Sequence, residues 1–215
     1  MEINKVVFLG SPEFCLPTLE AVHKHFGSKL VGVFSQSDKP RGRGQYISFT
    51  PVKLWASEKY IPVFQPGSKE EFSYEIRDIK PDLIFVVAYG MILPKDITDN
   101  FLCINSHASL LPDYRGASPM QAALLNGDKQ TGITLFKITE KMDSGDICAK
   151  QSIPIGDEDN IQSIHDKLSQ LSAEMSAQFF KDLESDNITF EPQDHDKATY
   201  CTKIQKTDYQ LNLND

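Results

Sequence analysis

Residues 83–90 read LIFVVAYG and residues 102–107 read LCINSH, and these two stretches decide the predicted fold class. Each begins with a continuous apolar run, which is typical of a strand buried on both faces of a parallel sheet. Each run then passes into small or polar residues. Because ligands bind beyond the carboxyl ends of the strands in an open parallel sheet, these two strand ends are also the first candidates for a site.

The same pattern continues toward the N-terminus. Apolar runs at 6–9 and 30–34 predict two more buried strands, and the segment between them predicts a helix. We expect Ser11 to cap that helix, Pro12 to lie in its first turn and Gly27 to end it. Strands that alternate with helices predict an α/β fold, namely a doubly wound, Rossmann-like, mostly parallel sheet with helices on both faces.

The second half of the chain has a different pattern. Residues 131–136 and 146–155 predict two strands joined by a polar loop, which we expect to form an antiparallel edge pair. A long helix follows, because its apolar residues step by three or four positions and form one stripe. These residues are Ile161, Ile164, Leu168, Leu171, Met175, Phe179 and Leu183. We assign residues 1–186 to one catalytic domain and residues 187–215 to a linker or tail.

The remaining segments carry weaker signals. Helices are expected at 51–58 and 69–79, and the polar tail allows short strands near 188–190 and 198–203. Residues 35–50 have no apolar period and predict a loop. A loop of that length in a compact domain is usually functional or disordered.

Composition limits the class of protein. The chain has 215 residues, of which 40% are hydrophobic and 24% are charged, as in ordinary globular proteins. It contains no apolar run near the ~20 residues of a membrane span and no signal-peptide layout at its N-terminus. Its four cysteines form no CxxC pair, which favours a reduced, cytoplasmic protein. Neither a zinc-ligand spacing nor a phosphate-binding P-loop is present, so we expect no metal.

Charge is unevenly distributed. The net charge of −8 does not favour general nucleic-acid binding. Residues 36–59, however, carry five basic and two acidic side chains, a local charge of +3. On charge alone this segment is equally consistent with a solvated face and with a surface that attracts an anionic partner.

Asn105 and His107 are the candidate catalytic residues. They are two positions apart at a strand end, so their side chains point to the same side and can converge on one substrate atom. An Asn amide can donate to a developing oxyanion, and a His can donate a proton near neutral pH. The alternative is a structural histidine at the entry to a loop.

Two neighbouring segments also stand out. The loop Ser109-Leu110-Leu111-Pro112 is unusually apolar, so it either lines the site of an aromatic ligand or tucks into the core. Residues 143–146 read DSGD and predict a turn with local side-chain caps.

Taken together, the motifs resemble one enzyme family. They are NSHASLLP at 105–112, YRG at 114–116 and MDSGD at 142–146. In combination they closely resemble the formyltransferases that use 10-formyltetrahydrofolate. The resemblance runs from FLGSPEF at 8–14 to ATYCTKI at 198–204, which is nearly the whole chain.

The resemblance implies site residues and a co-substrate. It implies that Asn105, His107 and Asp143 form the catalytic trio, and that 10-formyltetrahydrofolate binds without a metal. The residues implied in folate binding are Ser109, Leu110, Leu111, Pro112, Val87, Ala88, Tyr89, Gly90, Met91, Ile92 and Leu93.

The acceptor is implied by the loop that contains KPRGRG at 39–44. This loop resembles an insertion found in the branch of the family that formylates the α-amino group of methionyl initiator tRNA for translation initiation. It implies that Lys39, Arg41 and Arg43 contact the tRNA, and we expect a monomer.

Two alternatives to this acceptor remain. One is N-formylation of an amino-sugar nucleotide by the same chemistry, and the other is a folate- or RNA-binding module without turnover. Members of the family usually carry a further, barrel-like C-terminal domain, which we expect to be absent here.

Overall fold

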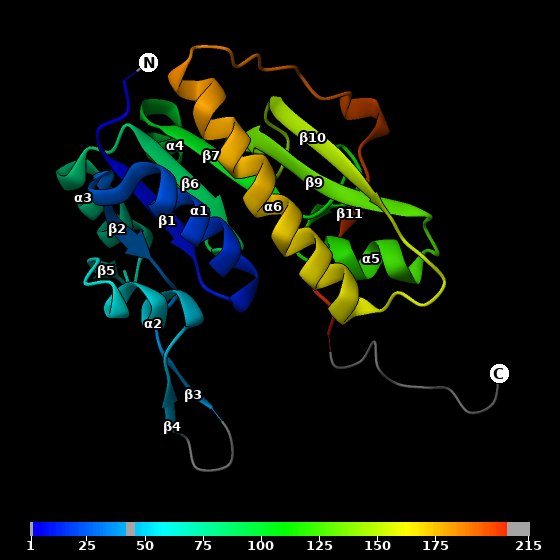
Figure 1. Ribbon diagram of the computed structural model, residues 1–215, viewed down its shortest axis with the longest axis horizontal. Coiled ribbons are helices and arrows are strands. Elements are labelled where there is room, and N and C mark those ends of the chain that lie inside the picture. The colour runs from blue at the N-terminus through cyan, green and yellow to red at the C-terminus, as the bar shows by residue number, and fades with distance from the viewer. Residues whose placement is uncertain (1, 42–45, 206–215) are drawn as a thin grey trace.

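A computed structural model of the protein describes residues 2–41 and 46–205. Its centre is a seven-stranded sheet with the strand order β10-β9-β7-β6-β1-β2-β5 (Figure 1). In chain order these strands are β1 (Val6–Gly10), β2 (Leu30–Phe34), β5 (Val63–Phe64), β6 (Leu83–Val87), β7 (Leu102–His107), β9 (Gln130–Lys137) and β10 (Ile147–Pro154). Two small sheets pair β3 (Lys39–Arg41) with β4 (Tyr46–Ser48), and β8 (Arg115–Gly116) with β11 (Tyr200–Cys201).

The parallel part of the sheet is the part that the apolar runs predicted. Strand β1 pairs in parallel with β2 on one side and with β6 on the other, and β6 pairs in parallel with β7. Every residue of β1 and of β6 is buried, as expected for strands covered on both faces. The carboxyl ends of β1, β6 and β7 therefore meet at one edge, which confirms the predicted fold class.

The antiparallel edge pair is also confirmed. Strand β9 pairs antiparallel with β10, and it pairs antiparallel with β7 as well. The register places Asn105 opposite Phe136 and His107 opposite Thr134. Side chains from β9 therefore lie beside the polar end of β7.

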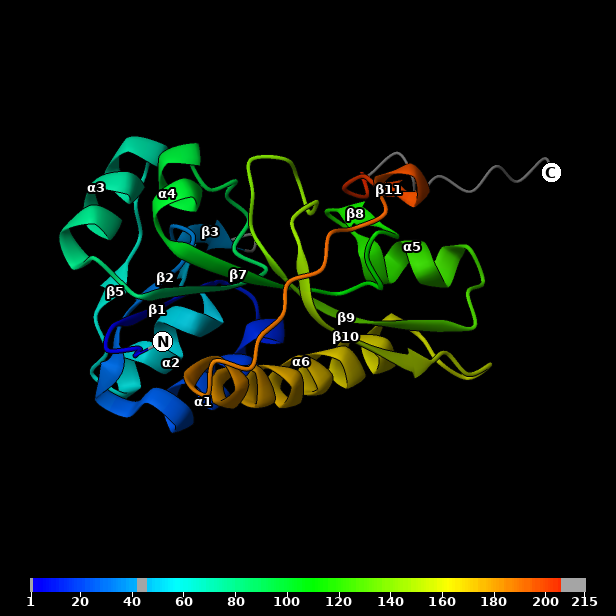
Figure 2. The same cartoon turned by 90° about the horizontal axis from the view of Figure 1, so that it is seen from above.

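Helices cover both faces of the sheet. They are α1 (Leu16–Phe26), α2 (Pro51–Glu58), α3 (Lys69–Ile79), α4 (Lys95–Asn100), α5 (Pro119–Leu125) and α6 (Ile161–Glu184). Figure 2 shows α1, α2 and α6 on one face and α3 and α4 on the other. The stripe predicted for the long helix is buried from Ile164 to Leu183, whereas Ile161 in the first turn is exposed.

The core has one cluster on each face. Phe26, Phe85 and Phe180 pack edge-on beneath α1 and α6. On the other face Phe34 stacks on Phe64. These rings pack on both faces of the central strands and hold them in place. The carboxyl ends of the strands therefore have fixed positions, as a site requires.

Three local expectations differ from the structure. Ser11 does not cap the first helix, because its hydroxyl accepts a hydrogen bond from the backbone N–H of Gln36 and a 3₁₀ turn (Glu13–Cys15) precedes α1. Residues 35–50, expected as a loop, contain the two strands of a β3–β4 hairpin. The short helices α4 and α5 were not expected, because each is too brief to show an apolar period.

The segment after α6 returns along the body of the protein. Residue Glu191 forms an isolated antiparallel bridge with Ile147, and β11 pairs in parallel with β8. A 3₁₀ turn (His195–Lys197) lies between these contacts, and no strand forms at 188–190. Within the described ranges, none of the helices is long and apolar enough to cross a membrane.

Candidate active site at the end of strand β7

The contact made by Ser106 shows where its neighbours on β7 point. Its buried hydroxyl lies 2.7 Å from the hydroxyl of Ser172 in α6. Because side chains alternate along a strand, Asn105 and His107 face the opposite side, away from α6. The two candidate side chains therefore share one side of the sheet end, as their spacing predicted.

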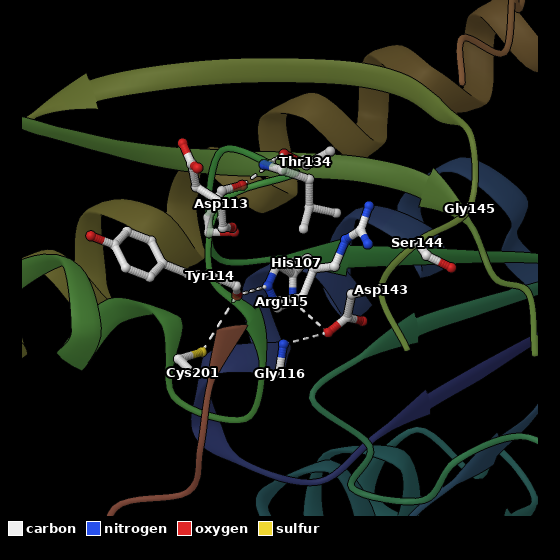
Figure 3. Close-up of polar contacts among 12 residues, drawn as sticks. His107, Asp113, Tyr114, Arg115, Gly116, Thr134, Asp143, Ser144, Gly145 and Cys201 are labelled. Carbon is white, nitrogen blue, oxygen red and sulfur yellow. Dashed lines mark hydrogen bonds and ion pairs between the residues drawn. The ribbon is translucent and has the colours of Figure 1, made fainter. Parts of the chain in front are cut away.

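The imidazole of His107 lies between a backbone carbonyl and a carboxylate (Figure 3). Its Nε2 atom is 2.9 Å from the carbonyl oxygen of Tyr114, and its Nδ1 atom is 3.8 Å from Oδ2 of Asp143. A carbonyl oxygen can only accept, so Nε2 carries a hydrogen. The Nδ1 edge of the ring faces the carboxylate of Asp143 without a direct hydrogen bond. Only 7% of His107 is exposed.

Asp143 is held by a backbone donor. Its Oδ2 atom accepts a hydrogen bond of 2.8 Å from the N–H of Gly116, and the same oxygen faces His107. Gly116 has a φ of +119°, and a Cβ there would lie 2.2 Å from the carbonyl oxygen of Cys201. Only glycine fits this position, so the chain can bring a backbone N–H to the carboxylate.

The turn that carries Asp143 has the local caps expected from its sequence. The hydroxyl of Ser144 donates to the carbonyl of Lys141 at 2.9 Å. A Cβ at Gly145 would lie 1.8 Å from the carbonyl oxygen of Lys137 in β9, so this turn packs tightly against the sheet. The carboxylate of Asp143 thus projects from a turn that is held by an internal hydrogen bond and by close packing against β9.

Thr134 of β9 organises the apolar loop after β7. Its hydroxyl donates to the carbonyl of Ser109 at 2.7 Å and accepts from the N–H of Leu111 at 3.1 Å. Ser109 and Leu111 are buried, whereas Leu110 and Pro112 are partly exposed. Both interpretations of this loop therefore apply, each to different residues: two side chains tuck into the core and two can contact a ligand.

The segment after β6 alternates in the same way. Its buried members are Val87, Tyr89 and Leu93, its exposed members are Ala88, Gly90 and Ile92, and Met91 is intermediate. Tyr89 packs against Phe72 in the core, so its ring supports the segment from behind. The exposed members and the partly exposed Met91 can contact a ligand, and folate binding by this segment stays a prediction.

Two shallow depressions lie along the loop after β7, with volumes of about 660 and about 400 Å³. They share Leu110, Asp113 and Gln130, and neither is lined by Asn105, His107 or Asp143. The larger one contains the phenol of Tyr114, which donates to Asp128 at 2.6 Å. Burial and this carboxylate raise the pKa of Tyr114, so the phenol remains a donor.

Two of the three residues expected to contact tRNA lie in β3, outside the seven-stranded sheet that carries Asn105 and His107. Lys39 and Arg41 belong to β3, of which the backbone is described, and Arg43 lies outside the described residues. Another base of the same segment, Lys53, is already engaged, because it binds Asp38 and donates to Gln65 at 2.8 Å. These contacts hold the base of the β3–β4 hairpin.

Three partners of the site were not predicted from the sequence. They are the carbonyl of Tyr114, the N–H of Gly116 and the side chain of Gln193. The first two are backbone groups, which leave no residue-type signal, and Gln193 lies in a polar tail. Across the described residues, no group of three or more His, Cys, Asp or Glu side chains is arranged to hold a metal ion.

Comparisons with known proteins agree with one another. The model of the family "Formyl transferase" matches residues 4–178. The chain is 47% identical over 209 residues to a methionyl-tRNA formyltransferase of Kosmotoga olearia, covering 95% of this chain and 67% of that protein. It is 44% identical over 211 residues to the methionyl-tRNA formyltransferase of Methylococcus capsulatus, covering 96% of this chain and 68% of that protein.

A solved structure shows the same fold. The 4-N formyltransferase of Francisella tularensis superimposes with a TM-score of 0.75 at 19% identity, covering 100% of this chain and 83% of that one. At this identity the likeness concerns the fold alone.

Proposed function

Because this chain belongs to the formyl transferase family, we propose that it transfers the formyl group of 10-formyltetrahydrofolate to the α-amino group of methionyl initiator tRNA. The observation that carries the proposal is 47% and 44% identity, over nearly the whole chain, to two proteins named methionyl-tRNA formyltransferase. The buried imidazole of His107 beside Asp143 supports it, because formyl transfer between two nitrogens needs a group that can move a proton near neutral pH.

The reaction is a transfer of one carbon between two nitrogens. The lone pair of the neutral α-amino group attacks the formyl carbon, and the new C–N bond pushes the carbonyl electrons onto oxygen. The resulting tetrahedral intermediate collapses and breaks the bond to N10 of the folate. The amino group loses one proton and N10 gains one, so no oxidant or metal is required for the balance.

Each member of the trio has a role that fits its place. The amide of Asn105 donates to the oxyanion from the face of β7 that it shares with His107. The Nε2–H of His107 is used by the carbonyl of Tyr114, so the Nδ1 edge is left to serve the reacting atoms. The carboxylate of Asp143 faces that edge at 3.8 Å and stabilises the protonated ring.

The folate would lie over the end of β7. Leu110 and Pro112 offer partly exposed apolar surface on one side, and Ala88, Gly90 and Ile92 are exposed on the strand end next to it. Strands β6 and β7 are adjacent, with Val86 opposite Asn105, so both segments reach the same space. If these two segments held the aromatic ring of the folate between them, the formyl group of the folate would lie near Asn105.

The acceptor is tested by competition. Purified protein is given 10-formyltetrahydrofolate with a labelled formyl group together with methionyl initiator tRNA, methionyl elongator tRNA and an amino-sugar nucleotide. We expect label on the methionyl group of the initiator tRNA with the highest kcat/KM. Label on the amino sugar alone would replace the acceptor, and folate or RNA binding without label would identify a module without turnover.

A further inference from the structure

The segment from residue 191 to residue 201, which we call the strap, lies across the active-site edge. Figure 2 shows the chain running from the end of α6 back across the sheet to β11. At one end Glu191 exchanges two backbone hydrogen bonds with Ile147, of 2.8 and 2.9 Å. At the other end β11 pairs with β8, and the carbonyl of Cys201 accepts from the N–H of Ala117. The strap therefore touches both chain segments that surround His107.

Gln193 is the buried residue of the strap, with 6% of its surface exposed. Its Nε2 donates to the carbonyl of Asp143 at 3.0 Å and to the carbonyl of Gly145 at 2.7 Å. Its Oε1 accepts from the guanidinium of Arg115, at 2.6 Å from Nη2 and 3.2 Å from Nε. One side chain thus links the turn of Asp143 to the residue before Gly116.

The orientation of this amide is fixed by its partners. The guanidinium of Arg115 can only donate, and the two backbone carbonyls can only accept. The amide oxygen must therefore face Arg115, and the amide nitrogen must face the turn. Glutamine supplies one acceptor and two donors at this length. Glutamate keeps the acceptor and loses both donors, and methionine loses all three.

The turn needs such a support. Asp143 has a φ of +47°, a left-handed conformation that is strained for a residue other than glycine and persists only where neighbours hold it. Rotation of its peptide would move the carboxylate as well as the carbonyl. Both hydrogen bonds from Gln193 are made to carbonyls of this turn, one at Asp143 itself. They therefore fix the direction in which the carboxylate leaves the chain.

We propose that Gln193 is a positioning residue, which holds the turn of Asp143 so that its carboxylate stays between His107 and the N–H of Gly116. The strap therefore contributes to the geometry of the active site through Gln193. The proposal deepens the function proposed above and rests on it for its kinetic test. Since a displacement of about 1 Å can cost about 100-fold in rate, two hydrogen bonds to the turn are enough to matter.

The kinetic test compares Gln193→Glu with Gln193→Met in the full chain. Glu keeps the hydrogen bond to Arg115, so we expect its melting temperature to stay near that of the wild type. Met loses the hydrogen bond to Arg115 in addition to the two hydrogen bonds to the turn. Both lose the donors to the turn, so both should lower kcat by roughly 10- to 100-fold, with KM for each substrate changed less than about threefold. Gln170→Glu, an exposed change of the same type on α6, is the matched control.

A double-mutant cycle separates positioning from general damage. If Gln193 acts through the carboxylate of Asp143, then Gln193→Glu should cost less than about threefold when it is added to Asp143→Asn. The same loss in both backgrounds would overturn the proposal. So would a raised KM with unchanged kcat, or loss of the folded state in both Gln193 variants, because either result would make Gln193 a binding or stability residue.

Amide exchange gives a readout that does not depend on activity. The N–H of Gly116 is protected by its hydrogen bond to Asp143, so NMR should show its exchange accelerated at least about 10-fold in Gln193→Glu, with the amides of β7 unchanged. Unchanged protection of Gly116 would contradict the proposal. If the wild-type protein formylated no acceptor, the proposed function would fail, whereas this exchange measurement would still test the link between Gln193 and Asp143.

Discussion

The Nδ1 atom of His107 lies 3.8 Å from the Oδ2 atom of Asp143, close enough for an ion pair when the imidazole is protonated and too far for a direct hydrogen bond. The carboxylate is not free to close this gap, because Gly116 holds the same oxygen at 2.8 Å. Asp143 therefore supplies charge beside the imidazole and leaves its Nδ1 edge open to the reacting atoms. Charge and geometry at this pair can be separated by mutation.

Asp143→Asn tests the charge. An Asn amide oxygen can still accept from Gly116, so the turn should keep its shape while the negative charge beside His107 is lost. We expect kcat to fall more than 10-fold, which corresponds to more than about 1.4 kcal/mol of transition-state stabilisation. The melting temperature should stay near that of the wild type. A variant that keeps more than about a tenth of the rate would show that Asp143 only caps its turn.

Ser172→Ala tests the support beneath β7. Ser172 lies 2.9 Å from the hydroxyl of Thr18 and 2.7 Å from that of Ser106, and all three are buried. Removing the hydroxyl of Ser172 leaves the buried hydroxyls of Thr18 and Ser106 without this partner, so we expect the free energy of unfolding to fall by about 1–3 kcal/mol. Urea unfolding measures this. Ser57→Ala, an exposed serine of α2, should stay within about 0.5 kcal/mol; equal effects would mean that the hydroxyl chain contributes nothing.

Arg41→Ala combined with Arg43→Ala tests the basic hairpin. Arginine pairs with phosphate, and each neutralised phosphate releases counterions. The double variant should use methionyl initiator tRNA less well. The slope of log kcat/KM against log salt concentration should become shallower by the amount expected for the loss of about one to two phosphate contacts. Folate binding should not change.

Arg77→Ala is the matched control for the hairpin, because Arg77 is exposed on α3 and pairs with Asp96. It should leave the use of tRNA and its salt dependence unaltered. If the double variant behaved like this control at every salt concentration, the hairpin would be a solvated connection and the amino-sugar alternative would gain support.

Asp159 predicts a pH dependence of stability. Its carboxylate binds Lys167 at 2.7 Å and accepts from the N–H of Gly156 and the hydroxyl of Ser163, and these partners lower its pKa to about 2. A depressed pKa in the folded state stabilises the protein above the unfolded pKa, near 3.9, and this stabilisation is lost as pH falls toward 2. Asp159→Asn should therefore unfold at lower urea than the wild type at pH 6, and the difference should shrink between pH 4 and pH 2. A constant difference would show that the ionisation of Asp159 is irrelevant.

Much of the fold could be predicted because its signals are local. Four strands of the large sheet are marked by apolar runs, and α6 is marked by an apolar stripe along its length. The side shared by Asn105 and His107 also follows from strand alternation. Each of these features depends on residues that are neighbours in the sequence.

What could not be predicted depends on contacts between distant residues. The β3–β4 hairpin has strands of three residues with no apolar alternation, and α4 spans only six residues. In the site, the acceptor for His107 is a backbone carbonyl seven residues away, and Gln193 reaches Asp143 across 50 residues. A polar tail gives no sign that one of its glutamines will be buried.

If His107 and Asp143 carry out the proton transfers of formyl transfer, the turnover of His107→Ala must show it. The measurement is kcat for transfer of a labelled formyl group from 10-formyltetrahydrofolate to methionyl initiator tRNA, with folate affinity and melting temperature determined on the same samples. We expect a kcat lower by about 10²–10⁴, the usual range for a positioned acid–base group, with folate binding and folding retained. Turnover near that of the wild type in a folded His107→Ala protein would show that His107 takes no part in the reaction.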